Sequence, residues 1–273
     1  MPLRNAMQYW EAIVLGIVQG LTEFLPVSST GHLVLAETLL GVGNPDDNVL
    51  FKVLLHFGTL LSVLLFFRKR LWDLTRAVFN PEMKDERKMI FYLFIGTVPA
   101  VLAALTLKDP IRNALGSPLI TCCMLIVTGI LLLLPPYIKK LKAQQTEQDL
   151  SLKRSLFIGA FQALALLPGI SRSGSTIVAG MIAGIKPSLA AEFSFLLSIP
   201  AIVGGIVFEA KAIFDLEASL AGPYAVGTLA AFLMGLTAVY TVLTTIRKGK
   251  FQYFAYYCLL VGFFGVFYFY GKA

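Results

Sequence analysis

Apolar residues fill several long stretches of this chain, and most of these stretches are long enough to cross a lipid bilayer. The hydrocarbon core of a bilayer is about 30 Å thick, and an α-helix crosses it with roughly 20 apolar residues. Each stretch is bounded by charged residues, proline or glycine, which marks where a helix begins and ends. The pattern predicts six membrane-spanning helices, at residues 51–67, 89–107, 117–136, 189–208, 223–246 and 251–270.

Two further apolar stretches, at residues 11–41 and 155–186, are interrupted in the middle by proline and small polar residues. The interruptions read FLPVSSTGH in the first stretch and LLPGISRSGST in the second. A broken helix leaves backbone groups without partners, and it is tolerated at membrane depth only inside protein or beside a wet cavity. We therefore expect two re-entrant helical hairpins, each entering and leaving the membrane on one side.

Composition supports an integral membrane protein with a wholly helical fold. The 273 residues are 57% hydrophobic and only 14% charged, with a mean hydropathy of +0.76, whereas about a quarter of the residues in a soluble domain are charged. This excludes an ordinary soluble domain and argues against nucleic-acid binding, despite the net charge of +7. Cys122, Cys123 and Cys258 lie in apolar runs, where small hydrophobic roles are expected.

Basic residues alternate along the chain in a way that orients the helices. Residues 68–88, 137–154 and 247–250 hold seven, five and three Lys or Arg, whereas 42–50, 108–116 and 209–222 hold only Lys108, Arg112 and Lys211. Cytoplasmic loops accumulate Lys and Arg, so the first three segments are expected inside, with Lys84 and Lys142, and the others outside, with Asp46 and Asp215. The alternation requires hairpin 11–41 to open outward and hairpin 155–186 inward, with both termini outside.

The two interrupted stretches are related in sequence when the second is shifted by 143 residues. The identical pairs are Gly16 and Gly159, Gln19 and Gln162, Leu21 and Leu164, Ser28 and Ser171, Gly31 and Gly174, Ala36 and Ala179, and Gly41 and Gly184. Each hairpin is followed by three crossings, which predicts an inverted-topology repeat. The expected organisation is one membrane domain over 1–273, with repeats at 11–136 and 155–270 and with the two hairpin tips meeting near the midplane.

Polar residues at the first tip predict a functional site, because polar groups within a membrane are costly. The tip brings Gln19, Glu23, Ser28, Ser29, Thr30 and His32. Gln19 and Glu23 are four residues apart and share one helix face. Their oxygens suit Mg²⁺ or Ca²⁺, with substrate oxygens and water completing the shell. A buried ion pair between Glu23 and Arg172 is the simpler alternative, and the two interpretations are compatible.

The second tip predicts an anion site for a phosphate or diphosphate. It brings Ser171, Arg172, Ser173, Ser175 and Thr176 just after Pro168 and Gly169, where a helix restarts. Helix N-termini and a forked guanidinium both suit phosphate oxygens. A purely structural Arg172 is the alternative.

Three further polar residues lie in or beside the predicted helices. His32 follows four small residues and could be a base, a nucleophile or an acid. His56, the only other histidine, lies inside a predicted crossing, so a structural role is expected. Glu192, at the start of the crossing after the second hairpin, has no evident partner in the sequence.

Two motifs, QGLTEFLPVSSTGH at residues 19–32 and LPGISRSGST at residues 167–176, closely resemble those of the bacterial undecaprenyl-diphosphatase family, also called the bacitracin-resistance family. The resemblance runs over essentially the whole chain. It implies hydrolysis of undecaprenyl diphosphate to undecaprenyl phosphate and inorganic phosphate, which recycles the lipid carrier for cell-wall synthesis. It also implies a divalent cation, location in the bacterial cytoplasmic membrane and a site open to the outer face; a homodimer is left open.

The resemblance also assigns residues. Gln19 and Glu23 match the family's (E/Q)xxxE motif, and Gln at position 19 argues against assuming a two-carboxylate metal site. Ser29 and His32 match its serine and histidine. Arg172, with Ser171, Ser173 and Thr176, matches its PGxSRSxxT motif, and Ser28 and Thr30 are expected to help bind the diphosphate. Because a hydroxyl needs activation, we favour Ser29 as nucleophile with His32 as base, while His32 or water as nucleophile stays open.

Two rival functions use similar features. A transporter would also be built from an inverted repeat with broken helices. A lipid phosphatase of the type-2 phosphatidic acid phosphatase superfamily would share the Ser-Thr-Gly-His and Ser-Arg sequences. That superfamily needs a second histidine shortly after the Ser-Arg pair, and this chain has none there.

Overall fold

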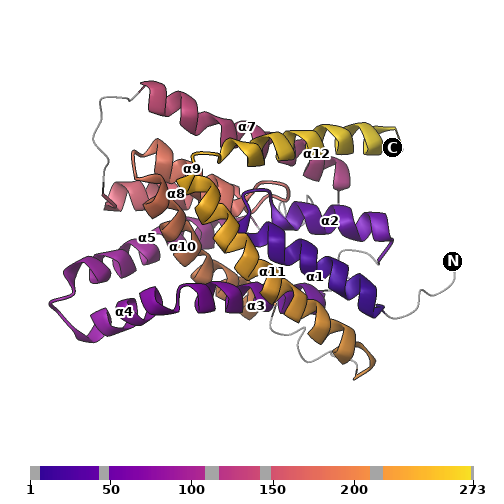
Figure 1. The fold of residues 1–273 in the computed structure, drawn as a ribbon, viewed down its shortest axis with the longest axis horizontal. Helices are drawn as coiled ribbons and strands as arrows, with labels where there is room; N and C mark the ends of the chain where they lie inside the picture. The colour runs from indigo at the N-terminus through magenta and orange to yellow at the C-terminus, as the bar shows by residue number, and fades with distance from the viewer. Residues whose placement is uncertain (1–6, 43–48, 108–116, 142–148, 210–217, 272–273) are drawn as a thin grey trace.

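The computed structural model describes residues 7–42, 49–107, 117–141, 149–209 and 218–271, and within them the chain is wholly helical (Figure 1). Asp46, Lys142 and Asp215, which carry topology predictions, lie outside the described residues, as do Lys108, Arg112 and Lys211. The helices are α1 (Tyr9–Phe24), α2 (Ser29–Leu40), α3 (Val49–Phe66), α4 (Arg68–Phe79), α5 (Lys84–Thr106), α7 (Pro118–Leu141), α8 (Leu152–Leu164), α9 (Arg172–Ile182), α10 (Pro187–Phe208), α11 (Ala221–Arg247) and α12 (Gln252–Tyr270), with a short 3₁₀ turn at Ala218–Leu220.

The six predicted crossings are confirmed as helices long and apolar enough to span a membrane. They are α3, α5, α7, α10, α11 and α12, and their ends differ from the predicted ones by a few residues. Large side chains along α12 face outward: Leu260, Phe263 and Phe267 are 70%, 61% and 82% exposed. Exposed apolar side chains in such numbers are typical of a surface that contacts lipid rather than water.

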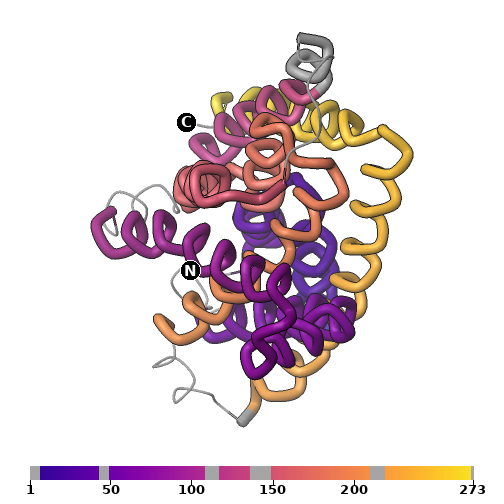
Figure 2. Tube along the Cα trace, turned by 90° about the vertical axis from the view of Figure 1, so that its left-hand side faces the viewer, coloured from indigo at the N-terminus to yellow at the C-terminus, as the bar shows by residue number. Residues whose placement is uncertain are grey.

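The two interrupted stretches each form a pair of packed helices with a break at the predicted place. Helices α1 and α2 are separated by residues 25–28, and α8 and α9 by residues 165–171. In the view of Figure 2, the indigo segment that holds α1 and α2 lies in the middle of the molecule, with the other helices around it.

Small residues allow α1 to lie directly against α11. A methyl group added at Gly16 would lie 2.2 Å from the carbonyl oxygen of Gly227, and one at Gly20 would lie 2.5 Å from that of Ala231. Both approaches are too close for any side chain, so the two backbones touch. Membrane helices commonly associate in this way, through van der Waals contact between small residues four apart.

One helix was missed from the sequence. Residues 68–88 were read only as a basic loop, whereas 68–79 form α4 at the left-hand end of the molecule in Figure 1. Charged residues give this segment a low apolar content, but two of its own side chains, Leu74 and Ala77, are buried. Arg70 of α4 also supplies the missing partner of Glu192, with a hydrogen bond of 2.8 Å from its Nε. This pair joins α4 to α10.

Candidate active site

The two helix breaks meet in space, which brings the two predicted polar tips together. The hydroxyl of Ser173 donates a hydrogen bond to the carbonyl oxygen of Leu25 across the junction, at 3.1 Å. A methyl group added at Gly31 would lie 3.2 Å from the Cα of Gly169. Segments separated by more than 130 residues in sequence thus form one polar cluster.

The first tip is held in an unusual backbone conformation at Ser28. Its φ of 72° is the only positive value at a non-glycine position among the described residues. Such conformations cost about 1–3 kcal/mol and persist where the surroundings impose them, often at functional sites. The Ser28 hydroxyl accepts a hydrogen bond from the backbone N–H of Gly31 at 3.3 Å, which caps the start of α2.

The second tip is fixed by α7 and by its own helix cap. Gly169 has a φ of +91° and lies so close to α7 that an added methyl group would be 2.4 Å from the carbonyl oxygen of Thr121. The Thr128 hydroxyl donates to the Gly169 carbonyl at 2.7 Å and accepts from the Ser171 N–H at 3.1 Å. The Ser171 hydroxyl then caps α9 by accepting from the Gly174 N–H at 3.1 Å.

Glu23 is buried at the centre of the cluster and joins the two tips. Its Oε1 accepts a hydrogen bond from Arg172 Nη2 at 2.5 Å, and the two side chains are only 6% and 16% exposed. Its Oε2 accepts from Ser29 Oγ at 2.7 Å and from Gln19 Nε2 at 3.0 Å. The ion pair between Glu23 and Arg172 that the sequence offered as an alternative is present, and Gln19 and Ser29 share the same carboxylate.

Two polar atoms of this cluster are buried without a hydrogen-bond partner among the described residues. They are Oε1 of Gln19, an acceptor, and Nη1 of Arg172, a donor. Buried polar groups nearly always have partners, and leaving one unsatisfied costs about 1–3 kcal/mol. Gln19 and Arg172 contact different oxygens of Glu23, and each keeps one polar atom without a partner in the described part of the chain. These two atoms indicate a place where a ligand supplies the missing hydrogen-bond partners.

His32 contacts the backbone of Ser28 and the side chain of Tyr257 rather than the hydroxyl of Ser29. Its Nδ1 lies 2.8 Å from the carbonyl oxygen of Ser28, and its Nε2 lies 2.9 Å from the hydroxyl of Tyr257. A carbonyl only accepts, so Nδ1 carries the proton, and Nε2 of the neutral ring accepts from Tyr257. The Ser29 hydroxyl donates to Glu23 instead. In this structure the acceptor of the Ser29 hydroxyl is therefore Glu23, and the role of His32 as base stays a prediction.

The remaining predicted residues divide between the junction and the packing around it. Thr30 is half-buried in the first turn of α2. Ser175 is buried, and its hydroxyl has no partner among the described residues. Thr176 is fully buried, and its hydroxyl contacts the Arg172 carbonyl at 2.8 Å and the Ser194 hydroxyl of α10 at 2.6 Å. Thr176 thus joins α9 to α10.

Two residues that the sequence did not place at the site make contacts with its side chains. Tyr257, in α12, stacks on His32 with ring centroids 5.5 Å apart and planes 12° apart. His56, in α3, was expected to be structural, but its Nε2 lies 3.8 Å from Oε2 of Glu23. No spacing in the sequence points to either contact. Only the presence of a rare histidine inside an apolar run was available as a signal for His56.

The donor atoms at the junction fit a divalent cation only in part. Gln19 and Glu23 offer hard oxygen ligands, and Gln19 Oε1 has no partner among the described residues. No group of three or more His, Cys, Asp or Glu side chains occurs within the part of the chain that the structure describes. An ion bound here would therefore need oxygens from a substrate or water, as Mg²⁺ commonly does.

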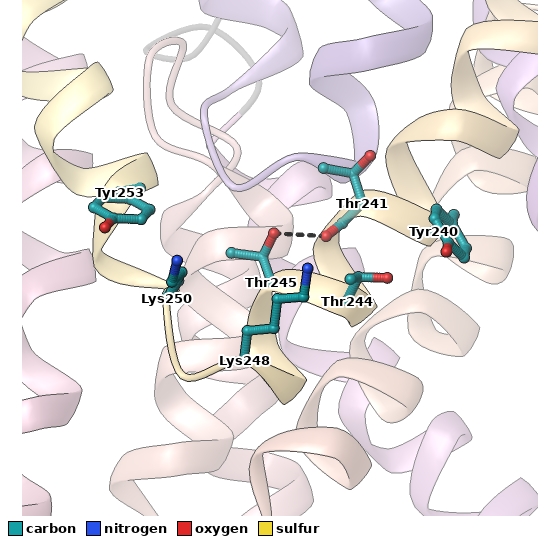
Figure 3. A pocket seen from close by; sticks show the side chains of 7 residues that line it. All are labelled: Tyr240, Thr241, Thr244, Thr245, Lys248, Lys250 and Tyr253. Carbon is teal, nitrogen blue, oxygen red and sulfur yellow. Dashed lines mark hydrogen bonds between the residues drawn. The ribbon is translucent and has the colours of Figure 1, made fainter.

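A separate cavity of about 290 Å³ lies where α11 turns into α12 (Figure 3). The residues that line it are Tyr240, Thr241, Thr244, Thr245, Lys248, Lys250 and Tyr253. One of its hydroxyls, that of Thr245, donates to the backbone oxygen of Thr241 at 2.7 Å. The lining contains no carboxylate, no histidine and no residue of the two tips, so the chemistry described above belongs to the junction.

The fold and the site define a multi-pass helical membrane protein with a buried polar centre made by two helix breaks. A family model described as "Bacitracin resistance protein BacA" matches residues 12–264, so the chain belongs to this family. A protein of Salinibacter ruber named undecaprenyl-diphosphatase is 39% identical over 268 residues, which cover 94% of this chain and 97% of that protein. A protein of Caulobacter sp. with the same name is 40% identical, over 93% and 95% of the two chains.

Proposed function

We propose that this protein hydrolyses undecaprenyl diphosphate to undecaprenyl phosphate and inorganic phosphate. The relatives that share its full length carry the name of this activity. The observation that carries the proposal is the Glu23–Arg172–Ser29 cluster, in which a buried guanidinium keeps one amino group without a partner among the described residues. The product is the lipid carrier for cell-wall synthesis, and its regeneration underlies resistance to bacitracin.

Arg172 is proposed to bind the diphosphate. Its Nη2 is engaged by Glu23, while Nη1 is buried and free to donate to a phosphate oxygen. Phosphoryl transfer depends mainly on positioning and on neutralising charge, and a guanidinium in a buried site supplies both. Ser28, Thr30, Ser171 and Ser173, at the starts of α2 and α9, are proposed to help bind the diphosphate.

Ser29 is proposed as the nucleophile. Its oxygen attacks the terminal phosphorus, the bond to the bridging oxygen breaks, and undecaprenyl phosphate leaves. The proton of Ser29 passes to Glu23, whose Oε2 already accepts it as a hydrogen bond at 2.7 Å. Water then hydrolyses the phosphoserine, releasing inorganic phosphate and restoring the hydroxyl. His32, one turn further along α2, is proposed as the base for this second step, with Tyr257 holding its ring.

A divalent cation, Mg²⁺ or Ca²⁺, is proposed to assist at the junction. Gln19 and Glu23 would hold it, together with oxygens of the diphosphate and water. When bound, such an ion neutralises charge on the diphosphate and orients it.

The proposed placement in the bacterial cytoplasmic membrane follows the charge pattern. Segments 11–41 and 155–186 are re-entrant hairpins of an inverted repeat, both termini are outside, and the site opens outward, where the diphosphate is released. Three observations support this arrangement: the bias of basic residues, the similarity of the two stretches at a shift of 143 residues, and the meeting of the two helix breaks. The polyprenyl tail stays in lipid beside the site.

Phosphate release from undecaprenyl diphosphate by the purified protein in detergent tests the proposal. We expect release that stops when a chelator removes divalent cations and returns when Mg²⁺ or Ca²⁺ is added back. A transporter would release no phosphate under any of these conditions, and that result would refute the proposed hydrolysis. Phosphate release that is insensitive to the chelator would refute the proposed role of the cation, but it would still support the proposed hydrolysis.

A further inference from the structure

We propose that His56 is a ligand of the divalent cation, through its Nε2 atom, beside Glu23 and Gln19. This inference rests on the proposed function, because it concerns the same site. It adds a third protein ligand, from α3, to a pair that the sequence placed only on α1.

A hydrogen bond at Nδ1 fixes the orientation of the His56 ring. Its Nδ1 lies 2.8 Å from the backbone carbonyl oxygen of Lys52. Because a carbonyl oxygen only accepts, Nδ1 donates this hydrogen bond, and Nε2 is the ring nitrogen available to bind an ion. Histidines that bind metals typically donate their other N–H to a carbonyl or carboxylate in this way, which fixes the ring and its tautomer.

Nε2 of His56 faces the carboxylate of Glu23. It lies 3.8 Å from Oε2, beyond hydrogen-bond distance. Two ligands bound to one ion at about 2.1 Å are separated by roughly 3.0 to 4.2 Å, depending on the angle between the bonds. The observed separation falls within this range, so one cation can bind both atoms.

The surroundings of these two atoms support an ion at this position. Gln19 hydrogen-bonds the same Glu23 oxygen, and its own Oε1 is buried without a partner among the described residues. The side chain of His56 is 32% exposed, so an ion can reach it. Arg172 contacts the other carboxylate oxygen, Oε1, so an ion at Oε2 would share that oxygen only with the hydrogen bonds from Ser29 and Gln19.

A nitrogen ligand changes which ions the site should hold best. Ca²⁺, Mg²⁺ and Mn²⁺ favour oxygen ligands, whereas imidazole suits transition metals such as Zn²⁺ and Ni²⁺. Mn²⁺ shares the oxygen preference of Mg²⁺ and is a suitable probe, because its electron spin reports directly on any nitrogen ligand.

The test is pulsed electron paramagnetic resonance of Mn²⁺ bound to the purified full-length protein in detergent, prepared without a histidine tag. The chain contains only two histidines, so the assignment needs only two variants. We expect a coupling to an imidazole nitrogen in the wild-type protein and in His32→Gln, and no such coupling in His56→Gln. Binding of Mn²⁺ should also weaken at least about tenfold in His56→Gln.

The outcomes separate this inference from the function on which it rests. Mn²⁺ that binds without nitrogen coupling, as it would if His56 were an imidazolium paired with Glu23, overturns the inference. A coupling lost only in His32→Gln, or no Mn²⁺ binding at all, also overturns it. If His56→Gln does not fold, ¹⁵N-histidine labelling of the wild-type and His32→Gln proteins gives the same answer. Phosphate release from the same preparations tests the proposed function independently.

Discussion

A single carboxylate, that of Glu23, organises the residues of the site. It receives Arg172 from one tip and Ser29 from the other, and both contacts are part-buried. Removing one partner of a buried ion pair leaves an uncompensated charge, which typically costs about 3–5 kcal/mol. Loss of either Glu23 or Arg172 alone should therefore destabilise the junction, and on our proposal the pair also orients the groups that act on the diphosphate.

At the residue scale, the account predicts which side chain becomes phosphorylated. Ser29→Ala should leave less activity than His32→Gln, because loss of the nucleophile stops the first step, whereas His32 serves only the second. Brief reaction with a labelled diphosphate, followed by peptide mapping, should find the label on Ser29, and more of it in His32→Gln. An acid-labile adduct on His32 would overturn the assignment, and no adduct in either protein would favour water as the nucleophile.

At the scale of elements, the two breaks are held by the helices around them rather than by the hairpins alone. Phe24, the last residue of α1, is fully buried and packs edge to face on Phe195 of α10, with ring centroids 5.9 Å apart. Thr128 of α7 holds the second break by bonding to both Gly169 and Ser171. The position of each tip thus depends on a helix from elsewhere in the chain.

A substitution at Gly169 tests how strictly the second break is built. Gly169→Ala should lower stability by at least about 2 kcal/mol, because alanine disfavours a φ of +91° and its methyl group would meet the Thr121 carbonyl at 2.4 Å. Gly205→Ala is the matched control, since among the described residues no atom outside its own stretch of helix lies within 4 Å of the added methyl group. Thermal unfolding in one detergent compares the two variants. Equal midpoints would show that the break tolerates a side chain.

Sequence patterns predicted the features that depend on neighbouring residues, but they did not predict contacts between residues far apart in the chain. Hydropathy predicted all six spans, and the polar interruptions predicted both breaks. Helix α4 was missed because its charged residues hide a narrow apolar face that includes Leu74 and Ala77. The contact between His32 and Tyr257 joins residues 225 positions apart, and His56 reaches Glu23 from another helix. Such contacts depend on tertiary packing, which no spacing in the sequence encodes.

At the scale of the whole molecule, the arrangement in the membrane decides which side the site faces. Helix α4 and the start of α5 lie at the left-hand end of Figure 1, whereas α12 ends at the right-hand end. The basic segment 68–88 belongs to the left-hand end, which the charge pattern assigns to the cytoplasm. On this assignment, the last residues of α12 lie on the outer side.

Cysteine labelling in intact cells tests this topology. With Cys122, Cys123 and Cys258 replaced by alanine, a membrane-impermeant maleimide should label Asp46→Cys and should not label Lys84→Cys. Lys84→Cys should become reactive once the cells are opened, which controls for its accessibility. Labelling of Lys84→Cys in intact cells would contradict the inverted repeat.

The central claim is that the two tips form one diphosphatase site, and a double-variant cycle tests it most directly. The measurement is kcat/KM for phosphate release by Arg172→Lys, by Glu23→Asp and by the double variant. Lysine keeps the charge but loses the planar fork, so Arg172→Lys should lose about 100-fold, or roughly 3 kcal/mol. The account predicts that the double variant loses little more than the worse single variant, because the two residues act as a unit. If the fold loss in kcat/KM of the double variant equals the product of the losses of the two single variants, Glu23 and Arg172 act independently. That result would contradict the account.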